Sequence, residues 1–147
     1  MTKAVTTIAV LSLITLLSGN PRPIESAIPA TVEKDFQKHA EDLKTRLKDR
    51  GFTILIEQPF VVIGDEPEAV VKQRSENTVK WAVEKLKHEY FTKDPSDILE
   101  IWLFKDDASY RKHAKEFFND DPDTPYGYYS SVNKALIMNI ATGFPPF

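Results

Sequence analysis

Cysteine is absent from this chain of 147 residues. The protein therefore has no disulfide framework, no thiolate zinc site and no cysteine nucleophile. Glycine is scarce: five residues are spread along the chain, and no glycine-rich loop is present to cradle a phosphate. Basic residues are not in excess, since 19 Lys and Arg stand against 22 Asp and Glu, which argues against a nucleic-acid-binding face. The composition that remains, 41% hydrophobic and 28% charged, is that of one globular domain with a hydrophobic core.

Long hydrophobic runs are missing too, except near the N-terminus. Lys3 precedes an apolar run over residues 4–17, which as a helix would rise about 21 Å and fall short of the ~30 Å hydrocarbon core of a membrane. This pattern predicts a secretory signal peptide, with the mature chain starting between Ser18 and Ile28. An uncleaved signal anchor or a buried helix is the alternative.

Three prolines in residues 20–30 indicate a linker after the signal. We therefore divide the chain into a signal peptide with linker, residues 1–27, and one domain, residues 28–147. The expected location is outside the cytoplasm, periplasmic or extracellular, with no stable membrane span once the signal is removed. We expect no nucleic-acid partner.

Hydrophobic periodicity predicts three helices and about five strands. Apolar residues at steps of three and four predict a first helix from Thr31, and Gly51 suits its C-terminal end. Asp65, with Glu68 three residues on, is typical of a helix start, and this second helix is expected to run to about Phe91. Asp106 is expected to cap the third helix. The strands are predicted at residues 52–57, 60–64, 98–104, 126–130 and 134–140.

This order of elements indicates an α+β domain, with a mixed sheet of about five strands covered by three helices. The run over residues 98–104 is the best core strand, because Glu100 is its only polar residue, and Trp102 is expected in the core. The last strand alternates, so we expect Leu136, Met138 and Ile140 on one face and Ala135, Ile137 and Asn139 on the other.

The three histidines show no metal-ligand spacing. His39 and His113 fall on helix flanks among charged residues and are expected to be exposed. His88 and Glu89 resemble the start of a zinc-binding helix, but the residue four positions after His88 is Thr92, not a second histidine. We favour a surface or capping role for His88, and expect no catalytic residue, no metal ligand and no cofactor in this chain.

Acidic residues gather in the loop after the third predicted helix, at Asp120, Asp121 and Asp123. Calcium sites use oxygen ligands at this density. The spacing does not match a calcium-binding loop, however, and the neighbouring prolines restrict wrapping around an ion. A solvated loop is the favoured interpretation.

A resemblance to a known family is carried by four runs of the sequence: FVVIGDEP, WAVEKLKHEYF, ILEIWLFKDDASYRKHA and TPYGYYSSVNKALIMNIATG. In this order, from about Phe60 to Gly143, they resemble the N-terminal half of bacterial exported peptidase-MA-like (gluzincin) metallopeptidases. The resemblance implies the sheet of a gluzincin N-terminal subdomain. In the complete family domain, a glycine-rich turn and an H-E-x-x-H helix would follow. The two histidines of that helix and a downstream Glu would hold zinc. Here Gly143 is followed by Phe-Pro-Pro-Phe, so no catalytic residue of the family has a matching position.

Three functional hypotheses follow. The leading one is a truncated, non-catalytic metallopeptidase-like protein that lacks its zinc site. The resemblance then implies that the last strand lies beside the substrate cleft, with Tyr126, Tyr128, Met138 and Asn139 as candidates for a substrate edge. The alternative is a self-contained extracytoplasmic binding module that uses the hairpin over residues 126–139 to dock a peptide. In either case an open C-terminal strand would favour self-association. A hydrolase with a metal-free mechanism is the third hypothesis.

Overall fold

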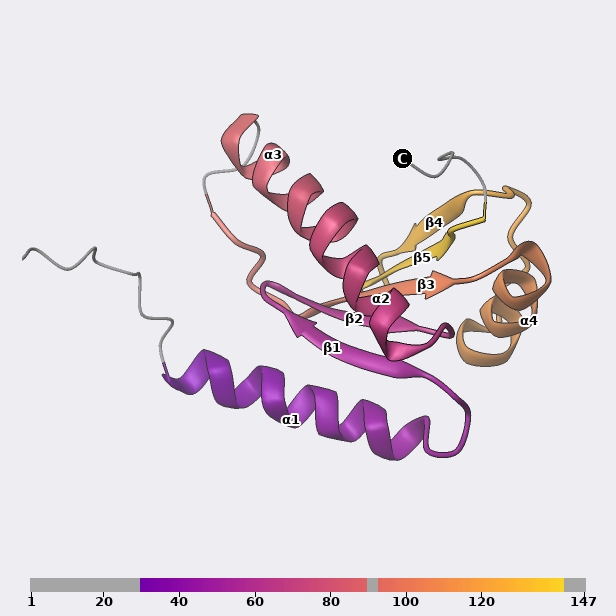
Figure 1. Cartoon of the computed structure of the whole chain (residues 1–147), viewed down its shortest axis with the longest axis horizontal. Coiled ribbons are helices and arrows are strands. Elements are labelled where there is room, and N and C mark those ends of the chain that lie inside the picture. The colour runs from indigo at the N-terminus through magenta and orange to yellow at the C-terminus, as the bar shows by residue number, and fades with distance from the viewer. Residues whose placement is uncertain (1–29, 90–92, 142–147) are drawn as a thin grey trace, which may run out of the picture.

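A five-stranded mixed sheet organises the fold (Figure 1). The computed structural model describes residues 30–89 and 93–141, so the predicted signal peptide and linker lie outside the described residues. The strand order is β1-β2-β3-β5-β4, in which β2, β3 and β5 run parallel while β1 and β4 are antiparallel strands at the two edges. The strands are β1 (Thr53–Glu57), β2 (Phe60–Gly64), β3 (Leu99–Phe104), β4 (Gly127–Ser130) and β5 (Ala135–Asn139).

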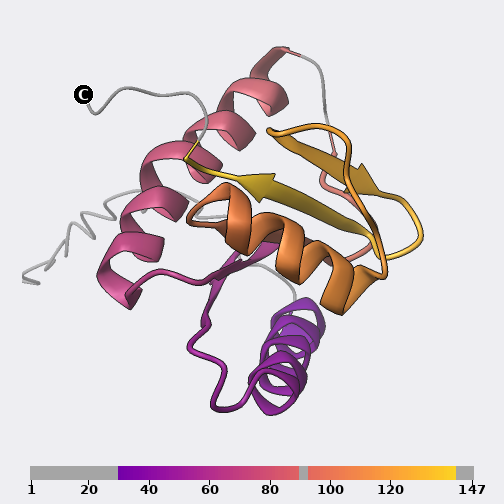
Figure 2. The ribbon, with the colours of Figure 1, turned by 90° about the vertical axis from the view of Figure 1, so that its right-hand side faces the viewer.

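Helices cover both faces of this sheet (Figures 1 and 2). One face carries α1 (Ala30–Arg46) and α4 (Asp107–Phe118). The other face carries α2 (Glu68–Arg74), which continues through the π-helical turn η1 (Ser75–Lys80) into α3 (Trp81–Glu89). Counted as one, this helix gives three helices in the described ranges, and the predicted α+β class is confirmed. None of the described helices has the length and apolar character that crossing a membrane requires.

The core on the α1/α4 face is built around Trp102, which is fully buried as predicted. Its ring lies 5.9 Å from that of Phe52 in an edge-to-face arrangement, and 5.3 Å from those of Phe117 and Phe118. These rings come from β3, from the entry to β1 and from the end of α4. The aromatic cluster therefore ties the sheet to the helices.

The opposite core, under α2 and α3, is aliphatic and centres on Val62, Val71, Val79, Ile101 and Leu103. Gly64 allows α2 to come close, because a Cβ at this position would lie 2.6 Å from a methyl carbon of Val71. The predicted alternation of β5 is confirmed. Ala135, Ile137 and Asn139 are buried on the α4 side, and Leu136, Met138 and Ile140 are half-buried at the margin of the aliphatic core.

The two predicted helix caps had different outcomes. Asp106 caps α4 as expected, since its Oδ1 accepts a hydrogen bond from the backbone N–H of Ser109 at 2.7 Å. Asp65 does not cap a helix: α2 begins at Glu68, after Pro67, with no side-chain cap. The prediction was wrong because Asp65 follows β2 at the end of the sheet where the chain passes from β3 into α4. Hydrogen-bond donors from that turn contact its carboxylate. Its carboxylate accepts hydrogen bonds from the backbone N–H of Lys105 at 2.8 Å and from the hydroxyl of Ser109.

Candidate functional site at the outer strand

The last strand of the described chain lies inside the sheet. β5 runs between β3 and β4, so Met138 lies opposite Leu103 on one side and Gly127 on the other. Its backbone groups are therefore used by ladders on both sides. The expectation that the C-terminal strand is an open edge is wrong, because β4 comes first in the sequence but lies at the edge of the sheet, and β5 lies between β4 and β3. The open edge belongs to β4.

The phase of the β4–β5 ladder shows which backbone groups of β4 face outward. The N–H of Asn139 donates to the carbonyl of Tyr126 at 2.9 Å. Because successive residues of an antiparallel strand turn their backbone groups to alternate sides, those of Tyr128 face β5, while those of Gly127 and Tyr129 face away from it. In the described part of the chain, no strand pairs with this outer side.

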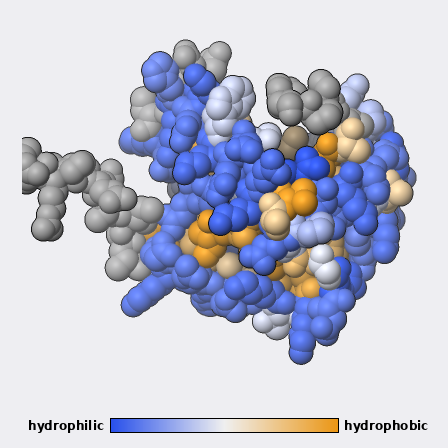
Figure 3. All heavy atoms as spheres, in the orientation of Figure 1, coloured by the Kyte–Doolittle hydropathy of each residue, from blue (hydrophilic) through white to orange (hydrophobic). Residues whose placement is uncertain are grey.

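Large apolar side chains gather at the same edge. Among the described residues, five large hydrophobic side chains are exposed: Val32, Trp81, Tyr126, Tyr129 and Val132. Three of these, Tyr126 at 64%, Tyr129 at 55% and Val132 at 91%, lie in β4 or next to it. The opposite edge strand, β1, differs because all of its residues are half-buried. On the face drawn in Figure 3, apolar residues reach the surface only as small groups among hydrophilic ones.

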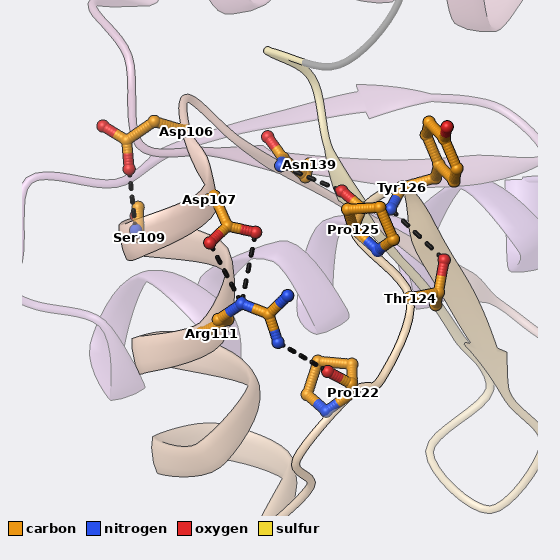
Figure 4. A network of polar contacts seen from close by, with 9 residues as sticks. All are labelled: Asp106, Asp107, Ser109, Arg111, Pro122, Thr124, Pro125, Tyr126 and Asn139. Carbon is orange, nitrogen blue, oxygen red and sulfur yellow. Dashed lines mark hydrogen bonds and ion pairs between the residues drawn. The ribbon is translucent and has the colours of Figure 1, made fainter.

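A network of polar contacts positions the entry to β4 (Figure 4). The Nδ2 group of Asn139 donates to the carbonyl of Pro125 at 2.9 Å. Arg111 of α4 donates to the carbonyl of Pro122 at 2.7 Å, and its Nε is held by the carboxylate of Asp107. The loop between α4 and β4 is thus fixed both to the helix and to β5. Asn139 is 3% exposed, and its side chain positions this loop.

Tyr128 points into the core, unlike its neighbours in β4. Its ring centre lies 6.4 Å from that of Tyr110, and neither hydroxyl makes a hydrogen bond within the described residues, although both are buried. Burial raises the pKa of Tyr128 far above the ordinary tyrosine value, and the nearby charge of Asp120 adds to this. Burial also raises the pKa of Tyr110. Of the candidate residues, then, Tyr126 is exposed, Tyr128 and Met138 are half-buried, and Asn139 is buried.

Sequence reasoning missed a buried carboxylate. Glu100 is 8% exposed and accepts hydrogen bonds from Nε1 of Trp102 at 2.7 Å and from Nε2 of His39 at 2.9 Å. The guanidinium of Arg46 lies 3.9 Å away. His39 and Arg46 both come from α1, so the cluster holds this helix against the sheet. His39 is two-thirds buried, contrary to the expectation of an exposed residue, because it reaches a partner 61 positions along the chain.

His113 is also less exposed than predicted. Its side chain is 14% exposed and stacks on the ring of Phe117 at 5.2 Å and on that of Phe104 at 5.4 Å. Nδ1 lies 3.1 Å from the carboxylate of Glu116. The helix flank that carries His113 faces the aromatic core, because α4 lies flat on the sheet. His113 therefore acts as one more ring of that core.

No metal centre is formed by the residues in ranges 30–89 and 93–141, since no three His, Asp or Glu side chains converge there. His88 is exposed near the end of α3, and Thr92 lies outside the described residues. Asp120, Asp121 and Asp123 are exposed in their loop. An open depression of about 410 Å³ lies between the end of α1 and β1, and its lining includes no histidine.

Comparison with models of protein families, with characterised proteins and with solved structures finds no match to this chain. The fold and the site together define an α+β domain with an open edge strand, β4, in which Tyr129 is exposed and which the exposed Tyr126 precedes.

Proposed function

We propose that this chain is a non-catalytic, metallopeptidase-like binding domain of an exported protein, and that it binds an extended polypeptide segment along the outer edge of β4. One observation supports this most directly. The outward backbone groups of Gly127 and Tyr129 lie among three exposed large side chains, at the edge of a sheet that is otherwise well covered. An added strand would pair with these backbone groups and gain affinity, while the side chains would provide selectivity.

The gluzincin-like runs supply the scaffold in this proposal. They cover β2 to β5, which are the parallel centre of the sheet and the open edge. Binding of an extended segment at a strand edge requires only backbone donors and acceptors, so it does not depend on the zinc of the complete family domain. A peptidase would need both the edge and the metal.

Hydrogen exchange tests strand addition directly. The probe is acetyl-Lys-Thr-Val-Thr-Val-Lys-amide, whose alternating residues favour an extended strand and whose charges suit the acidic loop at residues 120–123. We expect the peptide to slow exchange of the Gly127 and Tyr129 amides, and to leave the Tyr128 amide, already paired with β5, unchanged. A peptide N-methylated at alternate residues is the matched control. Unchanged exchange of Gly127 and Tyr129 at ~1 mM peptide would contradict the proposal.

A further inference from the structure

The geometry points to a specific occupant for this edge: β4 of a second copy of the chain, paired about a two-fold axis that passes beside Tyr128. This inference rests on the proposed strand addition at β4 and names its partner. It is carried by three independent features of the edge, namely the spacing of its outward backbone groups, the side chains on one face and the charges at the two ends.

The outward backbone groups are arranged symmetrically. Gly127 and Tyr129 flank Tyr128 and both face away from β5. Antiparallel pairing of two β4 strands, centred on Tyr128, therefore sets Gly127 of each copy opposite Tyr129 of the other. Each of these pairs exchanges both N–H···O bonds, as residues of a hydrogen-bonded antiparallel pair do. The contact is closed by the two-fold axis, so it joins two copies and does not extend into a fibre.

The side chains of Gly127 and Tyr129 fit the same register. Both residues present the sheet face that carries Leu136 and Met138. Position 127 requires a glycine, because a Cβ there would lie 2.6 Å from the carbonyl oxygen of Ile137 and 3.1 Å from Cα of Met138. In the two-fold pair, the exposed ring of Tyr129 from each copy covers the bare Gly127 of the other and shields the side chain of Met138. Aromatic residues opposite strand glycines are a known way to cover such gaps.

The charges favour the two-fold arrangement over a parallel one. Asp120, Asp121 and Asp123 precede β4, and none of them forms an ion pair with a lysine or arginine of the described chain. Lys134 follows β4 and contacts Asp97 at 2.7 Å on the surface. Antiparallel pairing brings the acidic end of one copy beside the Lys134 end of the other, whereas parallel pairing would set the two acidic loops together.

A four-residue strand buries little area, so the dimer is expected to be weak. Stable interfaces bury about 1,200 Å² or more, and this contact falls below that size. A dissociation constant on the order of 100 µM is expected, which makes association visible only as a dependence on concentration.

Sedimentation of the purified protein between ~10 µM and ~1 mM tests the inference. We expect a monomer–dimer equilibrium that Tyr129→Pro weakens by at least about tenfold, because proline removes an outward N–H while the β4–β5 ladder keeps its bonds. Tyr129→Thr keeps that N–H and loses only the ring, so a smaller weakening of about threefold is expected. Urea midpoints of both variants at low concentration verify that the monomer remains folded.

Exchange of the Gly127 and Tyr129 amides at low and high protein concentration separates this inference from the proposed function. Slower exchange of both amides at high concentration supports pairing of two copies at β4, and in Tyr129→Pro the remaining Gly127 amide should lose this slowing. A protein that stays monomeric, while the hexapeptide still slows these two amides, overturns the pairing and leaves strand addition standing. A dimer in which both amides exchange as fast as in the monomer overturns it too, because a different surface is then used. If neither peptide nor concentration changes exchange, both proposals are wrong.

Discussion

Replacing Trp102 by alanine is expected to cost about 3–5 kcal/mol of unfolding free energy. The side chain is fully buried, and four aromatic rings lie within 6.0 Å of its ring centre; they come from the entry to β1, from β3 and from α4. Truncation leaves a cavity that the rigid sheet cannot close. It also removes one of the two hydrogen-bond donors that Glu100 has among the described side chains, and leaves this buried carboxylate with His39 as the remaining one. Because small domains have a total stability of about 5–15 kcal/mol, the variant should lie close to the limit of folding.

Urea denaturation provides the measurement. For a slope of about 2 kcal/mol per molar, a loss of 3–5 kcal/mol moves the midpoint down by roughly 1.5–2.5 M. Trp102→Phe keeps much of the ring but also removes the donor to Glu100, so its midpoint should fall between those of the parent and the alanine variant. Trp81→Phe is the control, because Trp81 is 59% exposed and its loss should change stability by less than about 0.5 kcal/mol.

The two tryptophans also give separate fluorescence signals. Trp81→Phe leaves the buried Trp102 as the only reporter, and we expect its emission to shift to the red on unfolding. Coinciding midpoints of parent and Trp102→Ala would refute the assignment of β3 as the central strand. An equal loss in Trp81→Phe would refute it as well, because burial would then not explain the cost.

Four further outcomes are expected. Tyr110→Phe should be neutral or stabilise by up to about 1 kcal/mol in thermal unfolding, because the buried hydroxyl of Tyr110 has no hydrogen-bond partner among the described residues. A large loss of stability would reveal a missed hydrogen bond. Burial raises the pKa of Tyr128 in the folded protein, so the stability that the protonated side chain contributes is complete below the unfolded tyrosine pKa of about 10 and is lost as the pH rises through the folded pKa. Tyr128→Phe should therefore lessen unfolding at alkaline pH. An unchanged alkaline unfolding profile would argue against this cause. The hydrogen bond from Arg50 lowers the pKa of Glu116, so the stability that the ionised carboxylate contributes is present above the ordinary pKa of 4.5 and is lost as the pH falls through the folded pKa. Glu116→Gln should therefore make the loss of stability at acid pH less steep. The same acid dependence in both proteins would count against this explanation. Metal analysis of dialysed protein should find no stoichiometric zinc, whereas one zinc per chain that is lost on His88→Ala would overturn our interpretation of that histidine.

The signal-peptide prediction has its own measurement. Mass spectrometry of protein recovered from outside the cytoplasm should show a chain that starts between Ser18 and Ile28. A cytosolic protein that retains Met1 would contradict export.

Local patterns predicted the elements of the fold well. The span of β2 agrees with its apolar run at both ends, and the Asp106 cap was predictable because donor and acceptor lie three residues apart. The core position of Trp102 followed from the polarity of its neighbours in β3. In each case the information lies within a few residues of the element itself.

Contacts between distant segments were not predictable in this way. Glu100 looked like one polar residue in an apolar strand, since nothing near it in sequence shows that His39 from α1 will reach it. Hydrophobic periodicity also does not show the order of the strands in the sheet, because an alternating run such as β5 fits an interior position or an edge equally well. The candidate edge was therefore expected one strand too far inward. Tyr129 follows the candidate Tyr128 directly in the sequence, but only the ladder shows that its backbone groups face away from β5.

The position of β3 has a consequence for how the chain folds. The sheet consists of two hairpins, β1–β2 and β4–β5, and only β3 joins them, through parallel ladders on both of its sides. Each hairpin closes over a short stretch of chain and can form early, whereas both parallel ladders span long segments and form slowly. During synthesis, β3 emerges well before its second neighbour, β5, and its apolar residues then present an unpaired side. The most apolar strand of the native core is thus also the segment most exposed to wrong partners in the growing chain, until the last strand arrives to cover it.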